Sequence, residues 1–205
     1  MVSSPRTKDG KIIPSFAFIG PMAGGKNEYC DALQRAIEKE FGVSVFRPSF
    51  SAKISLIAQD LFPYMIQPGV KPRRLLQEIG AKMNEIDPAV WAKYLVRQII
   101  REDREPFIVD GIRRPEEMAV FKDGFPDFIA IRLDVDEQQR MEAYKKLHGR
   151  YPTQEEKENI TERTVASLPT DISIRNTYRR DDLERQIAEI IMKIQDGSIL
   201  DVLRK

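Results

Sequence analysis

The sequence predicts an α/β fold, in which a parallel β-sheet is covered by helices on both faces. Two observations carry this prediction. Short apolar runs alternate along the chain with longer segments of helical periodicity, and a glycine-rich segment ending in a lysine joins the first run to the first helix. Alternating strands and helices favour crossover connections, and these produce parallel pairing. With 205 residues, the chain has the length of one domain.

Five apolar runs have the length and composition of buried strands. Each is short, and most of its residues are Phe, Ile, Val, Leu or Ala, as is typical of strands covered on both faces. The runs span residues 15–19, 43–46, 106–109, 128–133 and 172–174.

Longer segments between these runs carry apolar residues at helical spacing. In the first, Leu33, Ile37 and Phe41 share one face, and Gly42 is suited to end the helix. The segment 151–167 is strongly polar and has little to bury, so we expect a helical flap on the surface. The other expected helices span residues 51–62, 73–85, 87–102, 115–122, 136–147 and 181–194.

Composition narrows the class of protein. A net charge of +1 argues against a dedicated nucleic-acid binder, because such proteins usually carry a basic excess. Cys30 is the one cysteine, so no internal disulfide can form, and a reducing cytoplasm is expected. Residues 1–13 are polar and do not resemble a signal peptide, and no apolar stretch reaches the length of a membrane span.

The segment Gly20–Lys26 has the pattern of a phosphate-binding loop. Its glycines allow the backbone to turn tightly enough to direct several N–H groups inward, and the following helix adds its positive N-terminal end. The lysine adds a full positive charge for the outer phosphates. The position after the lysine normally holds Ser or Thr, whose hydroxyl binds Mg²⁺, but here it is Asn27. The amide oxygen of Asn27 is suited either to bind the metal or to cap the helix.

Charged residues after the third strand complete the predicted site. Asp110 ends an apolar strand, and the carboxyl ends of parallel strands face the ligand crevice, so Asp110 is a candidate for Mg²⁺ or for a substrate hydroxyl. A phosphoryl-transfer enzyme needs cations around both phosphate groups, and arginine matches phosphate oxygens in pairs. The candidate arginines are Arg73, Arg74, Arg113, Arg114, Arg140 and Arg150.

Several motifs resemble those of the P-loop nucleoside monophosphate and dephospho-coenzyme A kinases, and most closely the deoxynucleoside monophosphate kinases of phages and bacteria. They read FAFIGPMAGGKNEY, RRLLQEIGAKMNEIDPAVWAKYL and FIVDGIRRPEEMAVF, with a strand-Asn pattern at Ile174–Asn176. The resemblance covers about residues 15–194. It implies a three-layer P-loop kinase sandwich with a five-stranded sheet, an acceptor-binding helical region at about 51–102 and a lid at about 140–168.

The same resemblance implies ATP as phosphoryl donor, Mg²⁺, and a nucleoside monophosphate as acceptor, in deoxynucleotide metabolism of a bacterial or phage-infected cytoplasm. Trp91 fits either the core or a base pocket. The oligomeric state is not defined by the sequence, and a homodimer remains open. The catalytic residues would be Lys26, Asp110, Arg113 and Arg150. ATP would be bound by Gly20, Ala23, Gly24, Gly25, Lys26, Asn27, Arg140 and Asn176. The acceptor would be bound by Arg74, Gln77, Trp91, Asp110 and Arg113, and Mg²⁺ would be bound by Asn27 and Asp110.

Two other functions compete with this one. The first is a kinase of another small acceptor, such as dephospho-coenzyme A. The second is a nucleotide-binding regulator without efficient transfer, which the asparagine at position 27 favours. Arginines in three separate segments favour a transfer enzyme, because a regulator needs no second phosphate site.

Overall fold

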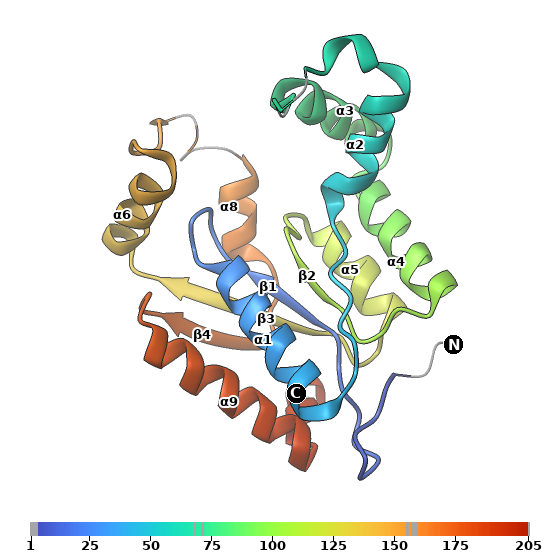
Figure 1. Ribbon diagram of the computed structural model, residues 1–205, viewed down its shortest axis with the longest axis vertical. Coiled ribbons are helices and arrows are strands. Elements are labelled where there is room, and N and C mark those ends of the chain that lie inside the picture. Colours follow the sequence, from blue (N-terminus) through green and yellow to red (C-terminus); the bar gives the residue numbers. More distant parts are fainter. Residues whose placement is uncertain (1–3, 68, 71, 155, 157–159, 205) are drawn as a thin grey trace.

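A computed structural model describes residues 4–67, 69–70, 72–154, 156 and 160–204. Its centre is a four-stranded, entirely parallel sheet in the order β2-β1-β3-β4 (Figure 1). The strands are β1 (Phe16–Ile19), β2 (Ile108–Asp110), β3 (Ile129–Val135) and β4 (Ile172–Asn176). The predicted parallel α/β class is therefore confirmed.

The prediction of a fifth strand at 43–46 is wrong. Only Phe46 pairs, through a single parallel bridge beside β2. The preceding residue is turned toward α1 (Lys26–Phe41): Val45 N–H donates to Glu38 Oε1 at 3.1 Å, and its carbonyl accepts from Gln34 Nε2 at 3.4 Å. These bonds direct the Val45 backbone groups toward α1 and away from β2. Phe46 alone exchanges hydrogen bonds with the edge of the sheet, with Pro106 and Ile108 at 2.9 Å each, so the sheet has four strands.

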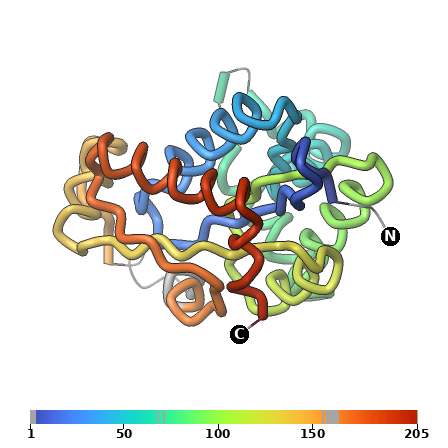
Figure 2. The backbone as a smooth tube through the Cα atoms, turned by 90° about the horizontal axis from the view of Figure 1, so that it is seen from below, coloured from blue at the N-terminus to red at the C-terminus, as the bar shows by residue number. Residues whose placement is uncertain are grey.

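Helices cover both faces of the sheet (Figure 2). Helices α1 and α9 (Arg180–Asp196) pack together on one face. Helices α4 (Val90–Glu102), α5 (Pro115–Gly124) and α8 (Ile160–Ser167) lie on the other.

Each face of the sheet has its own apolar core. In β1, Phe16 and Phe18 face the α1–α9 layer, whereas Ala17 and Ile19 face the opposite layer, and all four are buried. This alternation is the period of two expected of a strand, and burial on both faces explains why the run is continuously apolar.

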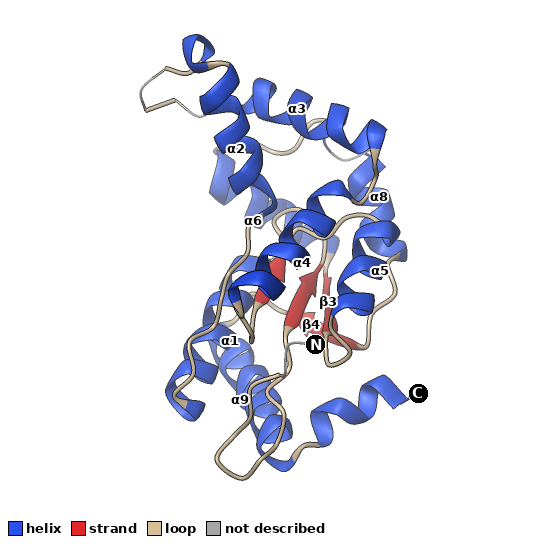
Figure 3. Cartoon of the chain, turned by 90° about the vertical axis from the view of Figure 1, so that its right-hand side faces the viewer, coloured by secondary structure: helices blue, strands red, loops and turns tan. Residues whose placement is uncertain are grey.

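Two helices project from the edge of this body as a helical arm (residues 50–86). The arm contains α2 (Phe50–Leu61), the short 3₁₀ turn η1 (Pro63–Met65) and α3 (Arg73–Ile86). Figure 3 shows the arm standing away from the strands, and α4 joins it to the body through contacts with both arm helices. The predicted helices in this region are present.

The remaining elements follow β3 and β4. Helix α6 (Glu137–His148) ends at Gly149, which has the left-handed conformation, with φ of 73°. Of the predicted polar flap, the described part includes α8, whereas residues 155 and 157–159 lie outside the described residues. A 3₁₀ segment, η2 (Ser198–Arg204), closes the chain after α9. Among the described residues, the structure has no helix with the length and apolar character needed to cross a membrane.

Candidate active site

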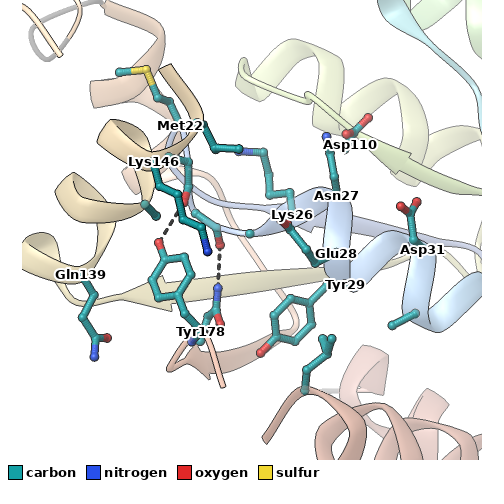
Figure 4. Close-up of a pocket in the computed structure, with 18 of the residues that line it drawn as sticks. Met22, Lys26, Asn27, Glu28, Tyr29, Asp31, Asp110, Gln139, Lys146 and Tyr178 are labelled. Atoms are coloured by element: carbon teal, nitrogen blue, oxygen red, sulfur yellow. Dashed lines mark hydrogen bonds between the residues drawn. The ribbon is translucent and has the colours of Figure 1, made fainter. Parts of the chain in front are cut away.

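A cavity of about 1900 Å³ opens at the carboxyl ends of the strands. Its walls come from the glycine-rich loop, the first three turns of α1, the end of β2, helix α6 and the start of α9 (Figure 4). This is the edge of a parallel sheet at which ligands bind in open α/β folds. The cavity therefore lies where the sequence predicts the site.

The loop between β1 and α1 is shaped by three residues. Gly24 N–H donates to the Pro21 carbonyl at 3.1 Å and closes a tight turn. Ala23 and Gly25 both have left-handed conformations, with φ of 57° and 82°. A Cβ atom on Gly24 would lie 2.8 Å from the Pro21 oxygen, so only glycine fits this position. Alternating backbone conformations of this kind form concave anion-binding loops.

Lys26 lies folded over this loop. Its Nζ donates to the carbonyl oxygens of Gly20 and Pro21, at 2.8 and 2.7 Å. Lys26 is also the first residue of α1, so its charge adds to the positive end of the helix. The predicted loop lysine is therefore at the cavity, with its ammonium held by the loop itself.

Asn27 and Asp110 are candidates for holding Mg²⁺. Both line the cavity, and Figure 4 shows their side chains directed toward one another from α1 and from the end of β2. The described residues contain no group of three His, Cys, Asp or Glu side chains suited to a metal ion. Mg²⁺ bound with substrate phosphates needs only one or two protein oxygens and keeps several waters. One carboxylate and one amide oxygen fit that requirement.

Arg113 lines the same cavity, two residues after Gly111. Its backbone is fixed by Glu117, whose Oε2 accepts the N–H groups of Arg113 and Arg114 at 2.8 and 3.2 Å. The Glu117 side chain is buried, and this burial raises its pKa, although the two N–H donors oppose the rise. The capping contact thus holds the arginine loop at the end of β2.

Side chains at the end of β4, just beyond it, and on α6 contact the phosphate loop from outside. Asn176 Nδ2 donates to the Gly24 carbonyl at 3.0 Å, and the Tyr178 hydroxyl donates to the Ala23 carbonyl at 2.8 Å. Partial burial raises the pKa of Tyr178 above its ordinary value, and a phenol is in any case protonated at neutral pH, so the hydroxyl can donate this bond. Arg140, predicted to bind ATP, pairs with Glu137 at 2.8 Å and makes a long 3.5 Å contact to the Met22 carbonyl.

Arg150 lies outside the cavity lining. Its guanidinium makes a two-pronged pair with Glu156, with both N–O distances at 2.8 Å, and donates to the Tyr151 carbonyl. The hydrogen bond from Arg150 holds the pKa of Glu156 well below its usual range. Reaching a phosphate in the cavity would require Arg150 to leave this partner.

The three other predicted acceptor-binding residues also lie outside the cavity lining. The Arg74 side chain is 93% exposed on the arm and pairs with Glu78 at 3.0 Å. Gln77 is exposed on the same helix. Trp91 is buried, and its Nε1 donates to the Gly80 carbonyl at 3.3 Å, which links α4 to α3.

Several residues of the lining were not predicted. Asp31 and Arg35 follow Asn27 at intervals of four, so their shared helical face was readable from the sequence. Nothing in the sequence marked Tyr178 or Lys146, because their positions depend on how α6 and the loop after β4 pack. The other unpredicted lining residues include Ser49, Phe50, Ser51 and Gln139.

No protein-family model matches the chain, and no curated protein matches its sequence. Solved structures do resemble its fold. A gluconokinase from Sinorhizobium meliloti 1021 superposes with a TM-score of 0.55 at 11% identity, covering 89% of this chain and 94% of that one. A sugar kinase from Janibacter sp. HTCC2649 gives 0.52 at 15% identity, covering 91% and 97%. The chain therefore has the α/β fold of these kinases.

Proposed function

We propose that the protein transfers the γ-phosphoryl group of ATP to a nucleoside monophosphate. The observation that carries the proposal is the continuity of one cavity. It joins a phosphate loop with its lysine, Lys26, to a carboxylate and an arginine at the end of the neighbouring strand, Asp110 and Arg113. A donor and an acceptor can thus occupy a single chamber, as direct transfer requires.

The size of the chamber supports two ligands. Pockets for single small molecules usually have volumes of about 300–1,000 Å³. The cavity measures about 1900 Å³, so it exceeds the upper end of that range by nearly a factor of two. A triphosphate on the loop would leave room for an acceptor beside Asp110 and Arg113.

The proposed step forms one bond and breaks one. A phosphate oxygen of the acceptor attacks the γ-phosphorus, and the bond from this phosphorus to the bridging oxygen breaks, leaving ADP and a nucleoside diphosphate. Lys26 and the loop N–H groups bind the donor phosphates, and Arg113 binds the acceptor phosphate. Bound Mg²⁺ would neutralise charge on the donor phosphates, with Asn27 and Asp110 as its protein ligands.

The arm and the lid would complete the acceptor site by closing. Arg74 and Gln77 are carried on α3, so they reach an acceptor only if the arm moves over the cavity. Trp91 acts through its link to α3. Arg140 lies on α6 and Arg150 lies just beyond its end, and closure would bring Arg150 to the transferring group and exclude water from it.

A coupled ADP-release assay with Mg²⁺ and ATP tests the proposal. The acceptor panel contains ribo- and deoxynucleoside monophosphates, dephospho-coenzyme A and gluconate. We expect turnover with at least one monophosphate and its loss in Lys26→Ala. Lys39→Ala is the matched control, because Lys39 is exposed at the far end of the same helix. Turnover with gluconate or dephospho-coenzyme A alone would reassign the acceptor. Tight ATP binding without any turnover would favour a regulator.

A further inference from the structure

The phosphate loop is contacted by two side chains at the end of β4: Asn176 is the last residue of this strand, and Tyr178 lies two residues beyond it. Tyr178 Oη donates to the Ala23 carbonyl at 2.8 Å, and Asn176 Nδ2 donates to the next carbonyl, that of Gly24, at 3.0 Å. These contacts join segments more than 150 residues apart in the chain. Both contacts are among the dashed lines of Figure 4, which labels Tyr178.

The Ala23–Gly24 peptide is fixed at both ends. Its carbonyl accepts from Tyr178, while its N–H, on Gly24, donates to the Pro21 carbonyl at 3.1 Å. A peptide unit is planar, with its C=O and N–H directed oppositely, so two such bonds leave it little freedom to rotate.

The next peptide is fixed through Asn176. Because Asn176 Nδ2 holds the Gly24 carbonyl, the N–H of Gly25 points the opposite way, away from Asn176. The Asn176 amide is itself oriented, since its Oδ1 accepts the Tyr178 N–H at 2.8 Å. The Asn176 side chain is buried, and both ends of its amide are used. The Asn176 side chain therefore fixes the orientation of the Gly24–Gly25 peptide in the loop.

Backbone strain is located at the same contact. Non-glycine residues rarely adopt positive φ, yet Ala23 has φ of 57° and Tyr178 has φ of 58°. These two residues are the acceptor and the donor of one hydrogen bond. Strained conformations persist where the surroundings determine them, and they concentrate at ligand sites.

We propose that Tyr178 and Asn176 are positioning residues that fix the loop peptides in the orientation that binds the donor phosphates. The inference rests on the proposed function in that it takes the loop as the donor phosphate site. It adds that phosphate affinity depends on the Tyr178 hydroxyl, a group outside the loop motif. An adenine-binding role for this tyrosine would depend on its ring instead.

The variant Tyr178→Phe separates these roles, because it keeps the ring and removes the hydroxyl. Calorimetric titration would measure the Kd of Mg²⁺–ATP and of Mg²⁺–tripolyphosphate, which has phosphates but no base. We expect both Kd values to rise by the same factor, about five- to tenfold, as for loss of one hydrogen bond. KM for ATP should rise more than kcat falls, with little change in Tm. The control Tyr64→Phe removes the same group from the exposed η1 turn and should leave both Kd values unchanged.

Three results would overturn the inference: a weaker ATP affinity with unchanged tripolyphosphate affinity, a change in Tm alone, or no change at all. Failure of the proposed function gives a different pattern. If the wild-type chain binds tripolyphosphate, Tyr178→Phe weakens it, and no acceptor is phosphorylated, then the positioning role stands and the kinase proposal fails. If the wild-type chain binds neither probe, both proposals are refuted.

Discussion

Glu105 provides a direct test of how burial of a carboxyl group changes its pKa, and through it the stability of the fold. The carboxyl group is half-buried immediately before β2, near Asp103 and Asp127. Burial, and then the negative charges of Asp127 and Asp103, raise the pKa of Glu105 from 4.5 to about 7. An acid whose pKa is raised by folding binds more protons in the folded than in the unfolded state between these two values. The free energy of unfolding therefore falls as pH rises from about 4.5 to 7.

The size of this effect follows from the pKa change. A rise from 4.5 to about 7, at about 1.36 kcal/mol per pH unit, corresponds to about 3.4 kcal/mol. Because Glu105 is only half-buried, solvent screening reduces the expected contribution to about 1–2 kcal/mol. Glutamine has a similar volume and no charge, so Glu105→Gln removes the destabilisation caused by a half-buried carboxylate at pH 8. At pH 4.5 the substitution should change the free energy of unfolding little.

Thermal denaturation of the wild type and Glu105→Gln between pH 4.5 and 8 measures the difference. We expect the variant to have a Tm higher by about 2–8 °C at pH 8, since about 1 kcal/mol shifts a domain of this size by about 2–4 °C. The gap should close as pH falls to 4.5. Asp60→Asn, on an exposed position of α2, controls for the change in net charge. A Tm gap that does not vary with pH would show that Glu105 ionises normally in the folded chain.

Three further substitutions test the loop, the arginine segment and the core. Gly25→Ala should reduce ATP affinity at least tenfold in titrations, because its Cβ would collide with the Asn176 amide and its φ of 82° suits glycine; unchanged affinity would contradict the loop geometry. Glu117→Ala should lower stability to urea by about 1–3 kcal/mol, by leaving backbone donors unpaired, and should raise the acceptor KM through Arg113. Phe107→Ala should cost about 3–5 kcal/mol in the same assay, since Phe107 is fully buried, and a loss below 1 kcal/mol would mean that the core repacks around the gap.

The order of elements and the place of the cavity followed from local patterns. Apolar runs covered on both faces became β1 to β4, and the heptad Gly20–Lys26 became the loop that joins β1 to α1. Asp110 and Arg113 were predicted beside it because parallel strands end at one edge of the sheet. These features depend on sequence neighbours or on topology, which the periodicity of the chain encodes.

Features that depend on distant side chains could not be read in advance. The run 43–46 has the composition of a strand, but Gln34 and Glu38 bind the backbone of Val45. The contact of Tyr178 with the loop likewise joins residues 155 positions apart. None of these hydrogen bonds leaves a periodic or compositional signal, so they appear only once the helices are packed.

The cations of the site have protein partners that a phosphate would have to displace. Lys26 donates to two loop carbonyls, and Arg150 pairs with Glu156 at an exposed position. Arg150 and Glu156 lie at the surface, where water and salt screen an ion pair and solvent can replace the contacts of each partner when the pair separates. Hydrogen bonds from cations to phosphate oxygens are stronger than those to neutral carbonyls, so Lys26 gains by the exchange. If the loop is the donor phosphate site, as proposed, this exchange would favour phosphate binding at Lys26, whereas Arg150 would have to give up its two-pronged pair with Glu156 to reach a phosphate.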